Sequence, residues 1–161
     1  MEEQARRLVE LLLERNMTLS TAESCTGGML AQMLTAVPGV SAVYAGGFVT
    51  YATRQKHDML GVPKKVLKEE GAIAKKTAKC MALGAAGKTG TDVAISVTGN
   101  AGPETQEGKP VGLVYVGICI DGKESAKKFM LEGDRQSIRR QVCLAALELA
   151  IDKLEIRRVE K

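Results

Sequence analysis

The chain is 161 residues long, with 45% hydrophobic and 26% charged residues, a composition typical of a soluble globular protein. This length suffices for one domain with a real core and is too short for two. The net charge is +4, and no basic run is interleaved with aromatic residues, so we expect no nucleic-acid partner. The longest apolar stretch, 111–120, falls well short of the roughly 18 residues that cross a bilayer, so we expect no membrane association.

The four cysteines lie far apart in the sequence, and none has the spacing of a zinc site. No signal peptide precedes the first helix-like segment. We therefore expect a reduced, cytoplasmic compartment, with the cysteines as small core residues and no bound metal or cofactor. The cysteines are Cys25, Cys80, Cys119 and Cys143.

Helices and strands alternate in the first half of the chain. Apolar residues recur at helical spacing over residues 3–15, which predicts an amphipathic helix that ends near Asn16. The expected elements that follow are a strand over 18–22, a helix over 29–34, a strand over 46–52, a helical turn over 53–60, and helices over 64–69 and 75–87.

Strands dominate the second half until a last helix. The expected elements are a buried strand over 92–98, a loop over 99–110, a β-hairpin over 112–120 and 124–131, and a helix capped by Asp134 with a frayed tail over 157–161. The whole pattern predicts a single-domain α/β fold over residues 1–161, a three-layer α/β/α sandwich with a mixed β-sheet.

A first candidate site is the turn from the strand over 18–22 into the next helix. Thr26, Gly27 and Gly28 place backbone N–H groups where a helix begins, and such groups favour an anion or a developing oxyanion. Ser24 would stand at the mouth of this pocket. A plain strand–helix turn with Thr26 as N-cap would leave the same pattern.

A second candidate is the segment that carries Tyr51 and Lys56. A lysine held among apolar groups loses its proton near neutral pH and can serve as the base for a serine, with a tyrosine hydroxyl as proton relay. An ordinary solvated lysine is the alternative. A Cys25–His57 pair is a rival, but neighbouring side chains point apart, so we place Ser24 and Lys56 in the pocket.

Two further segments could bind a phosphate or ribose group. The loop residues Gly99, Ala101, Gly102 and Pro103 follow a buried strand, and Lys109 closes the same loop with a cation. Arg135 and Arg139 lie one helical turn apart and could hold a phosphate bidentately. A simple connector and a solvated helix face would account for the same residues.

Four separated segments together resemble the CinA C-terminal domain family. They are TAESCTGG at 21–28, GGFVTY at 46–51 with Lys56 following, VTGNAGP at 97–103 with KPVGLVY at 109–115, and GDRQSIRRQ at 133–141. The match runs in order along nearly the whole chain. The sequence departs from the family pattern at Asn100 and over 104–106, within the expected ligand loop.

The resemblance implies an amidohydrolase that converts nicotinamide mononucleotide (NMN) and water to nicotinic acid mononucleotide and ammonia. It implies that the family's serine, tyrosine and lysine are Ser24, Tyr51 and Lys56 here. Two other functions remain open, a catalytically silent nucleotide-binding protein and an interaction module in competence or damage responses. Base rates for small cytosolic enzymes favour a homo-oligomer.

Overall fold

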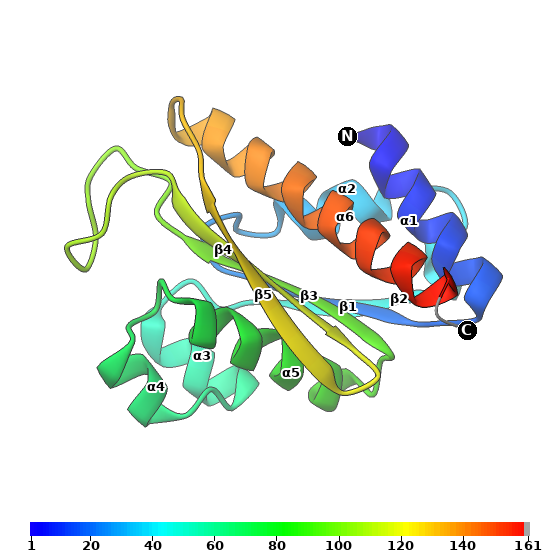
Figure 1. Ribbon diagram of the computed structural model, residues 1–161, viewed down its shortest axis with the longest axis horizontal. Helices are drawn as coiled ribbons and strands as arrows, with labels where there is room; N and C mark the ends of the chain where they lie inside the picture. The colour runs from blue at the N-terminus through cyan, green and yellow to red at the C-terminus, as the bar shows by residue number, and fades with distance from the viewer. Residues whose placement is uncertain (160–161) are drawn as a thin grey trace.

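A five-stranded mixed sheet forms the centre of the fold, in a computed structural model that describes residues 1–159 (Figure 1). The strand order is β2-β1-β3-β4-β5. β1 is parallel to β2 and to β3, whereas β4 is antiparallel to β3 and to β5. The strands are β1 Leu19–Glu23, β2 Tyr44–Val49, β3 Val93–Gly99, β4 Leu113–Ile120 and β5 Lys123–Met130.

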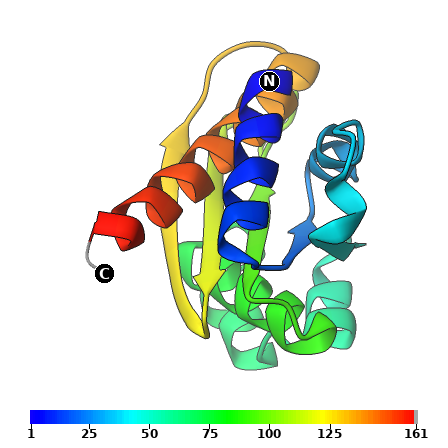
Figure 2. The same cartoon turned by 90° about the vertical axis from the view of Figure 1, so that its right-hand side faces the viewer.

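Helices cover both faces of the sheet, which confirms the predicted three-layer α/β/α arrangement (Figure 1). On one face, α1 lies beside α6 (Figure 2). No helix in the described part of the chain is long and apolar enough to cross a membrane. One layer contains α1 Glu2–Arg15, α2 Met29–Thr35 and α6 Arg135–Val159, and the other contains α3 Thr53–Leu60, α4 Lys64–Glu69 and α5 Lys75–Thr89, with a short 3-10 helix at Val40–Ala42.

The central strand β3 is buried on both faces of the sheet, as its weakly alternating, β-branched sequence predicts. Val93, Ile95 and Val97 belong to the core cluster shared with α1 and α6. Ala94 belongs to the cluster on the opposite face, where α5 packs with small alanine side chains. This alternation follows from the two-residue period of a strand.

The three parallel strands end at one edge of the sheet. Glu23, the last residue of β1, pairs with Val49 of β2 and with Val97 of β3. The segments that follow these strands therefore begin side by side: the turn at Ser24, the connection at Thr50 and the loop after β3. The carboxyl edge of a parallel sheet is the usual place for a ligand site.

Most sequence-based boundaries lie within one or two residues of those in the structure, and two differ by more. The strand expected over 46–52 is β2, and it ends at Val49 because its partner β1 ends at the opposite residue, Glu23. Tyr51 therefore lies in the connection to α3. The tail expected to fray from residue 157 is helical as far as Val159, and residues 160–161 lie outside the described part of the chain.

Gly84 allows α5 to approach the end of α3, the helix that carries Lys56. A methyl group at Gly84 would lie 2.0 Å from the Leu60 carbonyl oxygen, whereas no atom lies within 4 Å of the same position at Gly87. We expect Gly84→Ala to lower the free energy of unfolding by about 1–3 kcal/mol, the usual cost of overpacking. Gly87→Ala should be neutral or stabilising by about 0.5–1 kcal/mol. Urea denaturation of both variants measures this difference, and equal effects would contradict it.

Candidate active site

A buried lysine contacts a serine at the carboxyl edge of the sheet. The Nζ atom of Lys56 donates to Ser24 Oγ at 2.9 Å and to the Thr50 carbonyl oxygen at 2.7 Å. Ser24 Oγ lies 3.5 Å from the Tyr51 carbonyl oxygen. Ser24 directly follows β1 and Lys56 lies on the first turn of α3, so the fold brings together the two residues that the sequence analysis paired.

Burial changes the chemistry of Lys56. Its side chain is only 1% exposed, and Ser24 is 8% exposed. Desolvation lowers the pKa of Lys56 from 10.5 to about 8, while Cys25 and Glu107 act in the opposite direction. A lysine with this pKa has a neutral fraction near neutral pH, and neutral Nζ can accept a proton from the serine hydroxyl.

The helix N-terminus beside Ser24 is occupied by a carboxylate of the chain itself. Glu23 is buried, and its two oxygens accept the N–H groups of Leu30 at 2.8 Å and Ala31 at 3.1 Å. The sequence pattern predicted that these first N–H groups of the helix would favour a ligand anion. Glu23 already satisfies them, and it fixes α2 to the end of β1.

The turn after Ser24 leaves a different set of N–H groups open. The N–H of Gly27 donates to the Ser24 carbonyl oxygen at 3.0 Å, so it is not free for an oxyanion as the sequence analysis expected. The N–H groups of Cys25 and Thr26 donate to no acceptor in another described residue. Gly28 has a φ of 106° and serves as the N-cap of α2. The N–H of Gly28 likewise donates to no acceptor among the described residues, so the free donors of this turn lie on both sides of Gly27.

Tyr51 connects to Arg135 through its hydroxyl group. Arg135 Nη2 donates to Tyr51 Oη at 3.0 Å, and Arg135 Nη1 donates to the Gly102 carbonyl oxygen. The Tyr51 side chain is 59% exposed. In the described structure its hydroxyl bonds to Arg135 and its carbonyl oxygen faces Ser24, so no direct hydroxyl relay between Ser24 and Lys56 is present.

The other candidate phosphate ligands make contacts within the chain. Arg139 donates from Nε to the Cys25 carbonyl oxygen at 3.0 Å and from Nη2 to the Thr26 carbonyl oxygen at 2.9 Å. Gly99 ends β3, where a methyl group would lie 2.4 Å from the Val114 side chain. In the loop beyond it, Ala101 and Gly102 are buried and Pro103 is exposed.

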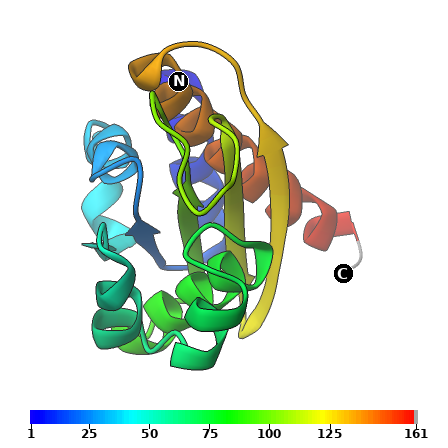
Figure 3. The same cartoon turned by 90° about the vertical axis from the view of Figure 1, so that its left-hand side faces the viewer.

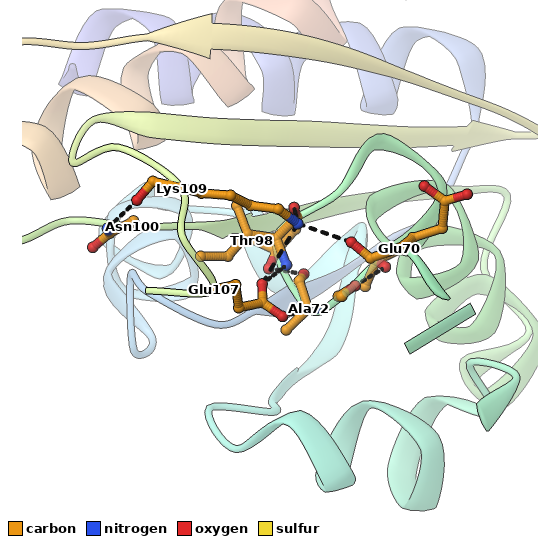
Figure 4. A network of polar contacts seen from close by, with 9 residues as sticks. Glu70, Ala72, Thr98, Asn100, Glu107 and Lys109 are labelled. Carbon is orange, nitrogen blue, oxygen red and sulfur yellow. Dashed lines mark hydrogen bonds and ion pairs between the residues drawn. The ribbon is translucent and has the colours of Figure 1, made fainter. Parts of the chain in front are cut away.

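The loop between β3 and β4 lies beside the segment before α5 (Figure 3). Lys109 and Glu107 attach this loop to that segment (Figure 4). Glu107 accepts the N–H groups of Ala72 and Ile73, each at 2.9 Å. Lys109 donates to the carbonyl oxygens of Glu70 and Ile73. Burial alone would raise the pKa of Glu107, but the N–H groups of Ile73 and Ala72 and the Lys109 ammonium lower it overall. Both charged groups thus bind complementary backbone atoms of one segment.

Cys25 and His57 do not form a catalytic pair. Cys25 lies in the hydrophobic core, and burial raises the pKa of its thiol to about 11. His57 Nδ1 lies 2.8 Å from the Val62 carbonyl oxygen at the end of α3. All four cysteines are free thiols.

Comparison with known proteins identifies the family. The model of the CinA C-terminal domain matches residues 1–154. The chain belongs to this family. The solved structure of a CinA superfamily protein from Klebsiella pneumoniae superimposes with a TM-score of 0.93 at 32% identity, covering 96% of this chain and 97% of that one. A competence/damage inducible protein from Agrobacterium tumefaciens superimposes with a TM-score of 0.90 at 40% identity, covering 96% and 94%.

Curated relatives in the CinA family are longer than this chain. A CinA-like protein of Dictyoglomus turgidum is 48% identical over 144 residues, which are 88% of this chain and 35% of the relative. A protein of Clostridium beijerinckii whose name refers to competence and damage induction is 46% identical over 144 residues, with the same coverage. The chain spans about a third of the length of these relatives.

Sequence reasoning missed three contributors to this CinA-family site. Glu23 bonds to α2 and Thr50 bonds to Lys56 across turns whose path the sequence does not reveal, and Glu107 lies in a loop without periodicity. An acidic residue at the end of a buried strand was the one signal that the sequence offered, at Glu23. Two buried hydroxyl oxygens of the site, Thr26 Oγ1 and Thr50 Oγ1, have no hydrogen-bond partner among the described residues.

Proposed function

We propose that this chain is a nicotinamide-nucleotide amidohydrolase that hydrolyses NMN to nicotinic acid mononucleotide and ammonia. The observation that carries the proposal is the buried contact of 2.9 Å between Lys56 Nζ and Ser24 Oγ, with the pKa of Lys56 lowered to about 8. Binding alone requires no such pair, because a desolvated lysine beside a serine costs stability and supplies a nucleophile with its base. Membership of the CinA family supports the same reaction.

Acylation begins with the neutral form of Lys56. Ser24 Oγ attacks the carboxamide carbon of NMN while Lys56 Nζ takes the hydroxyl proton. The carbonyl oxygen becomes an oxyanion, to which the free N–H groups of Cys25 and Thr26, next to Ser24 in the chain, can donate, each worth about 3 kcal/mol in sites of this kind. The intermediate then collapses as Lys56 returns the proton to the amide nitrogen, and ammonia leaves.

Deacylation repeats the same proton transfers with water. Lys56, neutral again, removes a proton from water as the water attacks the ester carbon of the acyl-enzyme. Collapse of the second intermediate returns the proton from Lys56 to Ser24 Oγ and releases nicotinic acid mononucleotide. One water is consumed and one ammonia is formed, so the cycle balances without an added reductant or oxidant.

For the phosphate group of NMN we favour Arg135 over the other basic candidates. Its side chain contacts the exposed Tyr51 hydroxyl, close to the backbone that faces Ser24. Lys109 is bound to carbonyl oxygens of Glu70 and Ile73, and Arg139 to those of the Ser24 turn. Arg135 also donates to the Gly102 carbonyl oxygen, but its side chain is exposed, and these two bonds use only two of its five N–H hydrogens. The remaining N–H groups can donate to a phosphate.

Ammonia release from NMN by the purified chain tests the proposed function. We expect ammonia and nicotinic acid mononucleotide to form in equal amounts. A coupled enzyme assay measures the ammonia, and chromatography measures the nucleotide. Binding of NMN without ammonia release would instead indicate a catalytically silent nucleotide-binding protein. Absence of both would leave the interaction-module function.

The rate should depend on pH through Lys56. Because only neutral Lys56 accepts the serine proton, kcat/KM should rise with pH and level off above about 8, where Lys56 titrates. The negative charge of Glu107 raises the pKa of Lys56. Glu107→Gln removes this charge, so the rising limb of its pH profile should shift to lower pH. Glu104→Gln removes an exposed charge from the same loop and is the matched control, with an unchanged limb. An identical limb in all three proteins would show that Lys56 does not sense Glu107.

A further inference from the structure

We propose that Arg139 is a positioning residue that orients the oxyanion donors of the Ser24 turn, rather than a ligand for the phosphate group. The inference rests on the proposed function of the same site. It starts from the two backbone carbonyl oxygens that Arg139 binds, those of Cys25 and Thr26. Both belong to the turn that directly follows the serine.

Each contact of Arg139 fixes the direction of one peptide plane. In a trans peptide the C=O of one residue and the N–H of the next point in opposite directions. The Nε–H bond to the Cys25 carbonyl oxygen therefore directs the N–H of Thr26 away from Arg139. The Nη2–H bond to the Thr26 carbonyl oxygen likewise directs the N–H of Gly27, which meets the Ser24 carbonyl oxygen.

The result is a turn with one face bonded and the other open. Arg139 occupies the carbonyl face, and the Gly27–Ser24 bond closes the turn. The N–H groups of Cys25 and Thr26 face no acceptor in another described residue. Gly27, at a φ of 58°, is compatible with this tight path because it lacks a side chain; a methyl group there would lie 3.4 Å from Arg139 Nη2.

Arg139 is itself held in place by α6. Asp134 caps this helix by accepting the N–H of Ser137 at 2.8 Å. The neighbouring side chain of Ile138 is buried in the core. Each of the three nitrogen atoms of Arg139 already donates a hydrogen bond, since Nη1 bonds to Gln136 Oε1. With all three nitrogen atoms bonded, the guanidinium group holds the backbone of the Ser24 turn in a fixed position relative to α6.

The two roles of Arg139 predict different kinetics. Misalignment of an oxyanion donor weakens binding of the transition state alone, because the carbonyl oxygen carries charge only there. The value of kcat therefore falls, and KM changes little. Loss of a phosphate ligand weakens ground-state binding as well, so KM rises. Losing one oxyanion donor typically lowers kcat by about 10²–10³-fold.

Steady-state kinetics with NMN test the inference on wild type, Arg139→Gln and Arg139→Lys. Arg140→Gln is the matched control, because Arg140 is the next residue, is exposed and makes no side-chain bond among the described residues. We expect kcat to fall by about 10²–10³-fold in Arg139→Gln with a nearly unchanged KM. Arg139→Lys should have an intermediate kcat, because an ammonium group can bind one of the two carbonyl oxygens but lacks the planar arrangement of donors that binds both. Arg140→Gln should equal wild type.

The outcomes separate this inference from the proposed function. A wild type that releases no ammonia overturns the proposed function and the inference with it. An active wild type with a raised KM and unchanged kcat in Arg139→Gln overturns the inference alone and makes Arg139 a ligand contact. Unchanged kinetics also overturn it. If Arg139→Gln does not fold by circular dichroism, Arg139→Lys decides, because a fully retained kcat in that variant would contradict the orienting role.

Discussion

Ser24→Ala should abolish ammonia release from NMN while the protein stays folded. Removing the nucleophile of an acyl-enzyme lowers kcat by roughly 10⁶-fold in well-studied hydrolases, which places turnover below detection here. The fold should tolerate the change, since alanine fits the same space and the Ser24 side chain contributes only the contacts to Lys56 and to the Tyr51 carbonyl oxygen. We expect a loss of stability no greater than about 1–1.5 kcal/mol, the usual net value of one hydrogen bond. Ammonia assay and urea denaturation measure the two effects.

Cys25→Ala is the control that separates the two neighbouring nucleophiles. It keeps the backbone N–H at position 25 and removes a thiol whose pKa is raised to about 11 by burial. This variant should still release ammonia. If Cys25→Ala were inactive and well folded while Ser24→Ala retained turnover, the thiol would be the nucleophile and the assignment of Ser24 would be wrong.

Lys56→Met should lower kcat by about 10²–10⁴-fold, the range that a general base contributes. Methionine retains much of the volume of the lysine stem but cannot accept the Ser24 proton. The remaining activity should also lose the rise toward pH 8 that Lys56 causes in the wild type. A pH–rate profile of both proteins measures this. Retention of the same limb in the variant would assign the titration to another group.

Lys56→Met should also change how the free energy of unfolding depends on pH. The unfolded chain binds the Lys56 proton with a pKa of 10.5, and the folded chain with a pKa of about 8. Between these values the unfolded state holds more protons, so the free energy of unfolding rises with pH, by up to about 3 kcal/mol from this residue. Below pH 8 both states are protonated, and the penalty for the buried charge is fully present.

Urea denaturation at pH 7 and pH 10 isolates this contribution. Other titrating groups act in both proteins, so they cancel when the pH effect on Lys56→Met is subtracted from that on the wild type. We expect the wild type to gain more stability than the variant between these pH values. Equal gains would mean that Lys56 titrates in the folded protein as it does in the unfolded chain, which would remove the basis for a lysine base.

Local patterns in the sequence determined most of the elements. The period of apolar residues predicted α1 and the helix at 75–87, and a weakly alternating, β-branched segment predicted β3. These signals are local, because each depends on which residues of one segment face the core. Boundaries depend on a partner, and β2 ends at Val49 because β1 ends opposite to it. Its end could not be predicted from its own residues.

The candidate site, too, could be predicted only in part from local sequence patterns. The small residues of the Ser24 turn were visible in the sequence, and neighbouring side chains on opposite faces favoured Ser24 over Cys25. Nothing local distinguished Lys56 from the other basic residues of the chain. Its burial at 1% exposure, and hence its pKa of about 8, arises because α3 places it behind the serine at the sheet edge.

Only the tertiary structure decided which charged group binds which backbone atom. Arg135 and Arg139 are one turn apart on α6, yet one reaches Tyr51 and the other reaches the Ser24 turn. Glu23 lies beside the serine in sequence, but its partners are the N–H groups of α2. The physical reason is that a hydrogen bond selects its partner by distance and direction at 3 Å, and these depend on how whole helices pack against the sheet.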